Sequence, residues 1–107
     1  MDELLHNTLL YDFYGRLLTE KQRDIYQLYF CEDMSLGEIG AKYGITRQAV
    51  NFSLKQSRKS LDEFEATLGL VSQHKNTKFY LNAMEQALKQ RDFDESNRIL
   101  LELGKLI

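Results

Sequence analysis

The sequence of 107 residues contains no proline, six glycines and a single cysteine. Because proline breaks helices, its absence leaves long stretches of the chain free to be helical. One cysteine, Cys31, excludes an internal disulfide framework and a cysteine-rich zinc site. No apolar run approaches the roughly 18 residues of a membrane span, and Met1-Asp2-Glu3 lacks the basic start of a signal peptide. We therefore expect a small, cytoplasmic, mainly helical protein that does not enter a membrane.

Sequence patterns typical of enzymes and metal sites are also missing. The chain has no glycine-rich phosphate loop, no nucleophile elbow and no paired-carboxylate motif. Its two histidines, His6 and His74, lie 68 residues apart and have no matching carboxylate pattern. We expect a protein that is not an enzyme and that holds neither a metal ion nor a cofactor.

The net charge is small, but the charges are distributed unevenly. The 14 Lys and Arg against 16 Asp and Glu leave a net charge of −2, whereas nucleic-acid-binding domains are usually basic. Residues 39–61 nevertheless contain five basic residues and no acidic one. These five are Lys42, Arg47, Lys55, Arg58 and Lys59. A basic segment inside an acidic protein is a local feature that requires a functional reason.

Apolar spacing and capping signals predict about six helices and no strand. In a first helix over 4–18, apolar residues recur every four positions and so lie near one side of the helix, namely Leu5, Leu9, Phe13 and Leu17. Capping boxes at Thr19–Gln22 and Ser35–Glu38 start the next two helices. The first of these two helices places Ile25, Leu28 and Tyr29 on one face.

A long helix is predicted over residues 47–68. Thr46 caps its start, and Gly69 follows its last residue as a stop signal. Its apolar seam, with spacings of four and three, consists of Val50, Leu54, Ser57, Leu61, Phe64 and Leu68. At 1.5 Å per residue the helix is about 33 Å long, more than a recognition helix needs. The excess is expected to pack on the C-terminal helices or on another subunit.

The C-terminal third is predicted as a pair of helices. Residues 70–76 show no periodicity and are predicted to form a connection. Helices over 76–90 and 95–106 then follow, with apolar sides made by Tyr80, Ala83, Met84, Ala87 and Leu88 and by Ile99, Leu100, Leu103 and Leu106. We expect a core over 1–69 and a C-terminal arm over 70–107, which together form one compact unit.

Residues 35–54 match the requirements of a helix-turn-helix motif. Gly40 is small where the second helix crosses the first, Gly44 turns the chain, and Ser53 is small enough for a crowded contact. The positions that lock the two helices together are all apolar, namely Ile39, Tyr43, Ile45 and Val50. All seven positions of the motif therefore carry a suitable residue.

Residues 35–50, Ser-Leu-Gly-Glu-Ile-Gly-Ala-Lys-Tyr-Gly-Ile-Thr-Arg-Gln-Ala-Val, resemble region 4 of bacterial sigma factors, the part that reads DNA. The similarity covers residues 18–61. With its length and Phe-Tyr-Gly at 13–15, the whole chain resembles the YlxM family of small DNA-binding proteins of Gram-positive bacteria. This resemblance implies an all-α, sigma region 4-like helix-turn-helix bundle with a long recognition helix and a C-terminal helical pair. It also implies a link to the signal recognition particle, beside whose genes such proteins are encoded.

In a helix-turn-helix, residues near the start of the second helix reach base edges in the major groove. Arg47 has the donors for guanine O6 and N7, Gln48 or Asn51 suits adenine, and Phe52 suits a thymine methyl group. The predicted phosphate contacts are Lys42, Thr46, Lys55, Arg58 and Lys59.

Three of these residues have an alternative interpretation. Arg58 lies four residues before Asp62, and Lys59 lies four residues before Glu63. Each of these cations is therefore equally suited to a surface ion pair along one helix. For Phe52 we favour a position in the core, against the helix around Ile25, over a position in the groove.

The sequence favours a helix-turn-helix regulatory protein that binds double-stranded DNA as a homodimer, because one module offers only a small interface. Residues 76–107 are the expected dimer surface. The alternative function is a non-enzymatic protein- or RNA-interaction adaptor of the secretory targeting machinery, with a signal-recognition-particle component as its partner. The net acidity and the gene context that the resemblance implies favour this alternative.

Overall fold

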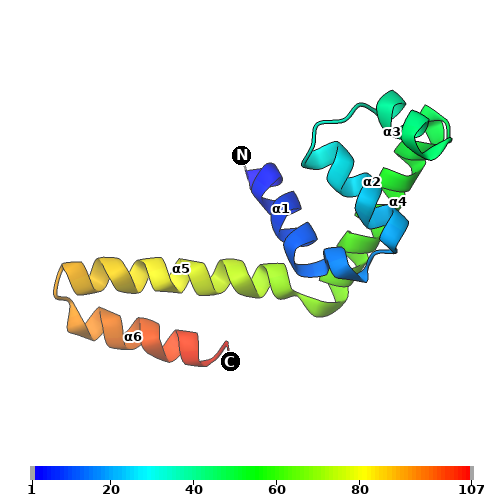
Figure 1. Ribbon diagram of the computed structural model, residues 1–107. Helices are drawn as coiled ribbons and strands as arrows, with labels where there is room; N and C mark the ends of the chain where they lie inside the picture. Colours follow the sequence, from blue (N-terminus) through cyan, green and yellow to red (C-terminus); the bar gives the residue numbers. More distant parts are fainter. Residues whose placement is uncertain (1, 107) are drawn as a thin grey trace. The chain divides into compact units, whose positions relative to one another are not determined.

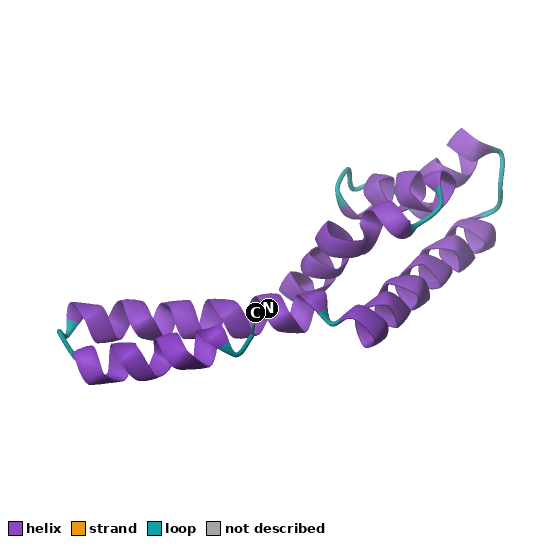
Figure 2. Ribbon diagram, turned by 90° about the horizontal axis from the view of Figure 1, so that it is seen from below, coloured by secondary structure: helices purple, strands orange, loops and turns teal. Residues whose placement is uncertain are grey.

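The computed structural model describes residues 2–106, which form six α-helices and one 3₁₀ helix (Figure 1). No strand occurs within this range, and the loops between the helices are short (Figure 2). The predicted all-α fold is therefore confirmed. The chain forms two compact units, Met1–Leu68 and Gly69–Ile107, each with its own packing.

The first unit is built around a long helix. It contains α1 (Asp2–Tyr14), the 3₁₀ helix η1 (Gly15–Leu17), α2 (Glu20–Phe30), α3 (Leu36–Tyr43) and α4 (Arg47–Leu68). Helix α4 packs against α1, α2 and α3. The buried apolar side chains of this unit are Leu10, Tyr14, Leu18, Ile25, Tyr26, Leu28, Ile39, Val50, Leu54 and Leu61.

The local signals for helix starts and for α4 are confirmed. Both capping boxes form, with Thr19 and Ser35 each exchanging two hydrogen bonds with the third residue of the following helix. Helix α4 has the predicted bounds, and the first four residues of its seam are buried. Phe64 is half-buried and Leu68 is exposed, so the seam is covered only along its first four turns.

The prediction for the first helix is wrong in its length, and the apolar stripe of this helix is not its buried side. Helix α1 ends at Tyr14, and Leu5, Phe13 and Leu17 of the predicted stripe are exposed. The helix is apolar on more than one side, so spacing alone does not select the face that meets α4. Tyr14 makes that selection: its ring is fully buried and its hydroxyl donates to Glu65 Oε1 of α4 at 2.5 Å.

The buried face of α2 also differs from the prediction by one residue. Tyr26 is buried and Tyr29 is exposed, although Ile25 and Leu28 are buried as expected. The ring of Tyr26 stacks on that of Tyr11 from α1, with centroids 4.8 Å apart and planes 4° from parallel. The spacing of apolar residues along either helix alone does not predict this stack between α1 and α2.

The second unit is an antiparallel hairpin of α5 (Leu70–Lys89) and α6 (Phe93–Gly104) (Figures 1 and 2). The turn between the helices contains Arg91 in a left-handed conformation, with φ of 55°. Ala87, Ser96 and Ile99 are buried between the two helices. Near the open end of the hairpin, Gln73 Nε2 donates to the carbonyl oxygen of Leu106 at 3.2 Å.

Two predictions for the second unit are corrected. Residues 70–76 belong to α5 and are not a connection, because Gly69, with φ of 65°, turns the chain in a single residue. Helix α6 begins at Phe93 because Asp92 caps it, accepting from the amide of Glu95 at 3.0 Å. Leu88 and Leu100, which belong to the predicted apolar sides of these helices, are exposed.

Candidate nucleic-acid interface

The turn between α3 and α4 is formed by one glycine and one hydroxyl group. Gly44 ends α3 in the left-handed region, with φ of 68° and ψ of 34°. Two residues later Thr46 caps α4, since its Oγ1 accepts from the amide of Ala49 at 3.0 Å. Both roles were predicted from the sequence, and together they define Arg47 as the first residue of α4.

The two helices approach closely at Gly40. A Cβ atom at this position would lie 2.5 Å from the carbonyl oxygen of Ile45, which is closer than a real contact permits. The Gly40 carbonyl itself accepts from the amide of Ile45 at 2.9 Å. Ile39 and Val50 are fully buried beside this contact, while Tyr43 and Ile45 are half-buried. Gly40 is thus the small residue that was predicted in α3, and the backbone that it allows to come close is that of the turn.

One side of α4, next to its buried seam, carries most of the predicted DNA contacts. At 100° per residue, the positions from Arg47 to Phe52 and on to Lys59 spread over about 140° of the helix. Seven side chains fall in this sector: Arg58 is half-buried, and the other six are exposed, namely Arg47, Gln48, Asn51, Phe52, Lys55 and Lys59. We call this sector the reading face of α4. Two acidic residues, Asp62 and Glu63, follow directly after it, so its basic character ends there.

Phe52 lies on the reading face and not in the core. Its side chain is 63% exposed, so the interpretation that we favoured from the sequence is wrong. Phe52 instead borders a shallow hollow of the surface, together with Ile25 and Ile45.

Arg58 is engaged within the protein, which counts against its predicted phosphate contact. Its Nε lies 3.1 Å from Asp62 Oδ1, and its Nη1 donates to Asn7 Oδ1 of α1. The side chain is half-buried and holds α1 against α4. The ion-pair alternative therefore describes Arg58. Lys59 differs, because within residues 2–106 it forms no ion pair with Glu63 or with any other acid.

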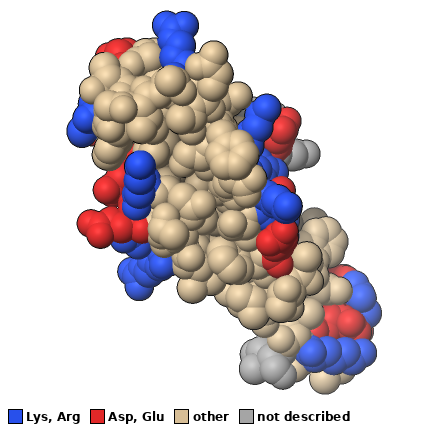
Figure 3. All heavy atoms as spheres, turned by 90° about the vertical axis from the view of Figure 1, so that its right-hand side faces the viewer, with Lys and Arg blue, Asp and Glu red and all other residues tan. Residues whose placement is uncertain are grey.

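The remaining predicted phosphate contacts are exposed and are distributed over α3 and α4. Lys42 is in the last turn of α3, Thr46 is at the start of α4, and Lys55 and Lys59 lie farther along α4. Figure 3 views the molecule from the α3 and α4 side of Figure 1 and shows Lys and Arg side chains, with Asp and Glu among them, around a broad uncharged area. Separated cations of this kind suit individual phosphates, which position a protein without reading sequence.

Comparison with known proteins identifies the family. Residues 1–100 match the family described as "UPF0122: Putative helix-turn-helix protein, YlxM / p13 like". The chain belongs to the UPF0122 family. The match extends through the helix-turn-helix unit and most of the α5–α6 hairpin, so both units are part of what the family shares.

Relatives in the UPF0122 family are similar over nearly their whole length. The UPF0122 protein Teth514_1714 of Thermoanaerobacter sp. (strain X514) is 42% identical over 110 residues, covering 99% of this chain and 94% of the relative. UPF0122 protein STH1464 of Symbiobacterium thermophilum is 38% identical, covering 96% of each chain. UPF0122 protein BH2485 of Halalkalibacterium halodurans is 36% identical, covering 95% of this chain and 94% of the relative.

The structure adds two residues to the interface of this UPF0122 chain that the sequence did not single out. The guanidinium of Arg47 lies against Gly37 in the first turn of α3, so a Cβ there would be 3.0 Å from Arg47 Nε. Lys21 of α2 lines the same hollow as Phe52 and adds a cation beside the reading face. Neither residue is close to α4 in sequence, so only the packing of α2 and α3 against α4 reveals them.

Among residues 2–106 the structure contains neither a candidate metal-binding site nor a candidate membrane-spanning helix. Within that range, no three His, Cys, Asp or Glu side chains are grouped so that they could hold a metal ion. None of the helices formed by these residues has both the length and the hydrophobicity for crossing a bilayer. The reading face of α4 is therefore the feature on which a functional proposal rests.

Proposed function

We propose that this protein binds double-stranded DNA as a homodimer and regulates transcription, with α4 in the major groove. The observation that carries the proposal is the reading face, where exposed Arg, Gln and Asn side chains follow directly after the helix-turn-helix turn. In such a motif these positions reach base edges. The proposal describes a non-enzymatic protein that acts in the cytoplasm, where the DNA is.

Each residue of the reading face has a distinct role in this proposal. Arg47 donates two hydrogen bonds to guanine, Gln48 or Asn51 bonds adenine in the same bidentate way, and Phe52 contacts a thymine methyl group. Lys42, Thr46, Lys55 and Lys59 contact phosphates and set the position of the module on the duplex. Arg58 is left out of this set, because Asp62 and Asn7 already hold its guanidinium.

The first test is the binding of duplex DNA across a series of salt concentrations. We would titrate a fluorescent pool of random duplexes, follow the anisotropy, and sequence the bound fraction. Three lysines per subunit give a dimer six phosphate contacts, so log K is expected to fall with log salt with a slope of about −5. A two-fold related sequence should be enriched, and its half-sites should be spaced by about one helical turn, 10 base pairs, or a multiple.

A double substitution tests the residues that read bases. Arg47→Ala with Gln48→Ala should remove the sequence preference and weaken specific binding by about 2–6 kcal/mol for each half-site of the dimer, since each bidentate contact contributes about 1–3 kcal/mol. The matched control is Arg91→Ala with Gln90→Ala, the same two residue types at exposed positions in the α5–α6 turn. The control should bind as the wild type does. Retained sequence preference in the first variant would contradict our assignment.

A second double substitution tests the phosphate contacts. Lys55→Ala with Lys59→Ala should weaken binding equally for all sequences and make the salt slope of a dimer shallower by about 4, roughly one unit per lost contact. Loss of affinity for one sequence only would show that these lysines read bases. A control at Lys105, which is paired with Glu102 in the second unit, should leave the slope unchanged.

The second candidate function is a protein- or RNA-binding adaptor of the secretory targeting machinery. It is favoured by exposed apolar side chains of α1 and η1, namely Leu4, Leu5 and Leu17, which are not part of the reading face. If the protein binds no duplex even at low salt, this candidate replaces the first. The promoter next to the signal-recognition-particle genes is the first specific DNA to examine, because resemblance to the YlxM family implies that neighbourhood.

A further inference from the structure

One side of the α5–α6 hairpin presents large apolar side chains to solvent. Leu81 and Leu88 lie seven residues apart on α5, and Phe93 and Leu100 lie seven apart on α6. Each pair therefore stands on one side of its helix, two turns apart. The four side chains are 52%, 51%, 63% and 58% exposed. Half or more of each apolar surface is thus left in water.

These four residues form a single continuous surface. On each helix these side chains are rotated by roughly 100° about the helix axis from the residues that face the other helix. The rotation has the same sense on both helices. In an antiparallel pair of helices the same sense of rotation leads to the same side of the pair. Between them lie Met84 and Leu103, which are half-buried. We call this surface the hairpin face, made of Leu81, Met84, Leu88, Phe93, Leu100 and Leu103.

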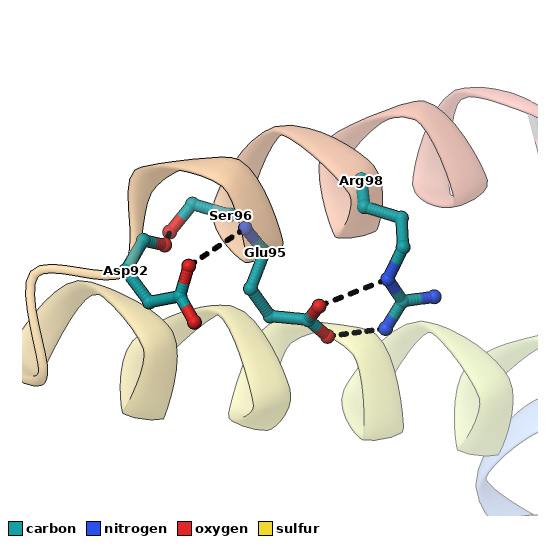
Figure 4. Close-up of polar contacts among 4 residues, drawn as sticks. All are labelled: Asp92, Glu95, Ser96 and Arg98. Atoms are coloured by element: carbon teal, nitrogen blue, oxygen red, sulfur yellow. Dashed lines mark hydrogen bonds and ion pairs between the residues drawn. The ribbon is translucent and has the colours of Figure 1, made fainter.

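The ion pairs of α6 lie on the opposite side of the hairpin. Arg98 Nε donates to Glu95 Oε2 at 3.0 Å, and Lys105 Nζ donates to Glu102 Oε1 at 3.0 Å. Figure 4 shows Glu95 and Arg98 bonded to each other along α6, close to the cap at Asp92. These charges are already paired within α6, and the hairpin face has none. A partner for this face must therefore be apolar.

The second unit also lacks the usual means of stabilising so few residues. It comprises residues 69–107, and below about 40 residues a fold usually needs a disulfide, a metal ion or association. The one cysteine of the chain, Cys31, belongs to the first unit. Residues 2–106 contain no cluster suited to a metal ion. Association is the remaining means, and the exposed apolar side chains are placed for it.

We propose that the hairpin face is a dimer interface, on which a second copy of this chain packs its own hairpin face to give a four-helix bundle. A two-fold axis pairs the same surface of both copies, so apolar side chains meet apolar side chains and no charge is buried. The bundle adds a dimer interface to the proposed function. It rests on that function for the reason why two α4 helices must be joined. Its geometry follows from α5 and α6 alone.

Sedimentation velocity of the full chain over a series of concentrations tests the bundle. The wild type should sediment with the mass of two chains, and high salt should not dissociate it, because burial of apolar surface is not screened. DNA binding has the opposite salt dependence. A wild type that stays monomeric at all concentrations would overturn the proposal, including the case in which the first unit of the same chain covers the hairpin face.

Two pairs of substitutions locate the interface. Leu88→Glu with Leu100→Glu places carboxylates in the bundle and should weaken dimerisation by at least about 100-fold. The control, Phe79→Glu with Leu101→Glu, changes side chains that are 67% and 70% exposed but lie off the hairpin face. It should dimerise as the wild type does. Equal weakening by both pairs would overturn the assignment of the face.

A milder variant covers the case in which the glutamates unfold the hairpin, which circular dichroism would reveal. Leu88→Ala with Leu100→Ala keeps the helix propensity of both helices and should still weaken the dimer by at least about 10-fold. Unchanged dimerisation of this variant would overturn the proposal. The two proposals can be told apart: a dimer that binds no DNA overturns the proposed DNA binding and leaves the bundle, whereas a monomer that binds DNA overturns the bundle and the homodimer and leaves DNA binding by α4.

Discussion

Two buried serines on helices differ in one hydrogen bond, and this difference changes what each contributes to stability. Ser96 Oγ donates to the carbonyl oxygen of Asp92 at 2.9 Å, within the first turn of α6. Ser57, in the seam of α4, is fully buried, and its Oγ has no hydrogen-bond partner among residues 2–106. An unsatisfied buried hydroxyl costs free energy, whereas a satisfied one does not.

We therefore expect opposite effects from the same substitution. Ser57→Ala should raise the free energy of unfolding by about 1 kcal/mol, since it removes the unsatisfied hydroxyl and gains helix propensity. Ser96→Ala is the matched control and should lower it by about 0.5–1.5 kcal/mol, because a hydrogen bond is lost. Chemical denaturation of both variants measures the difference. A loss of stability in Ser57→Ala would mean that its hydroxyl is bonded in solution.

At the same scale, the sequence predicted which residues lie near the start of α4, but not always whether their side chains are exposed or engaged by other helices. Arg47, Gln48 and Asn51 follow a capped turn, and their exposure on α4 agrees with that position. Phe52 and Arg58 were misjudged or left open, because burial depends on α1 and α2, which come from other parts of the chain. Spacing along one helix contains no information about these neighbours.

At the scale of elements, the close contact between α3 and the turn that follows it depends on the absence of a side chain at Gly40. The atom that a Cβ would meet is a backbone oxygen, that of Ile45, which cannot rotate away as a side chain can. Gly104 in α6 provides a comparison, because a Cβ there meets nothing within 4 Å. Both glycines lie in helices, where alanine has the higher intrinsic propensity.

The same glycine-to-alanine change should thus have opposite signs at these two positions. Gly40→Ala should lower the free energy of unfolding by about 1–2 kcal/mol, since overpacking outweighs the gain in helix propensity. Gly104→Ala should raise it by about 0.5–1 kcal/mol. Thermal unfolding followed by circular dichroism measures both. If Gly40→Ala is as stable as Gly104→Ala, the turn is looser than the structure indicates.

Helix boundaries were most predictable where a cap and a glycine enclosed the helix. Thr46 and Gly69 enclose α4, and its predicted bounds of 47–68 agree with the structure. For α5 the prediction missed the first two turns, because residues 70–76 lack periodicity yet contain no residue that stops a helix. Helix formation needs no amphipathic pattern when a neighbouring turn already starts the helix.

At the scale of the whole molecule, the stacked tyrosines connect stability to pH. Burial raises the pKa of Tyr11 and of Tyr26 above the ordinary value of 10.0. For Tyr26 the positive charge of Arg58 acts in the opposite direction, as a smaller effect than burial. The folded protein thus keeps phenolic protons at a pH at which the unfolded chain releases them.

The sign of the pH dependence follows from this difference. Stability from these groups is fully present below about pH 10, the ordinary tyrosine value, and is lost as the pH rises above it. Denaturant titrations at increasing pH, with tyrosinate absorbance in parallel, should show a midpoint that falls above pH 10. The control is Tyr11→Phe with Tyr26→Phe, which keeps both rings and should reduce the fall. An identical fall in the control would assign it to other groups.

The sequence by itself determined the helical class, the two capping boxes, the helix-turn-helix turn and the full extent of α4. These features depend on interactions between residues a few positions apart, which the order of amino acids specifies directly. Family membership likewise follows from the sequence, since the match covers residues 1–100.

Only the tertiary structure decided which side of α1 is buried, that Arg58 is engaged by α1, and that the hairpin face is open to solvent. Both α1 and α6 have apolar residues on more than one side, so several packings satisfy their sequences equally well. The choice among them depends on the free energy of contacts between distant segments, such as Tyr14 with Glu65 and Tyr11 with Tyr26. Those contacts exist only once the chain has folded.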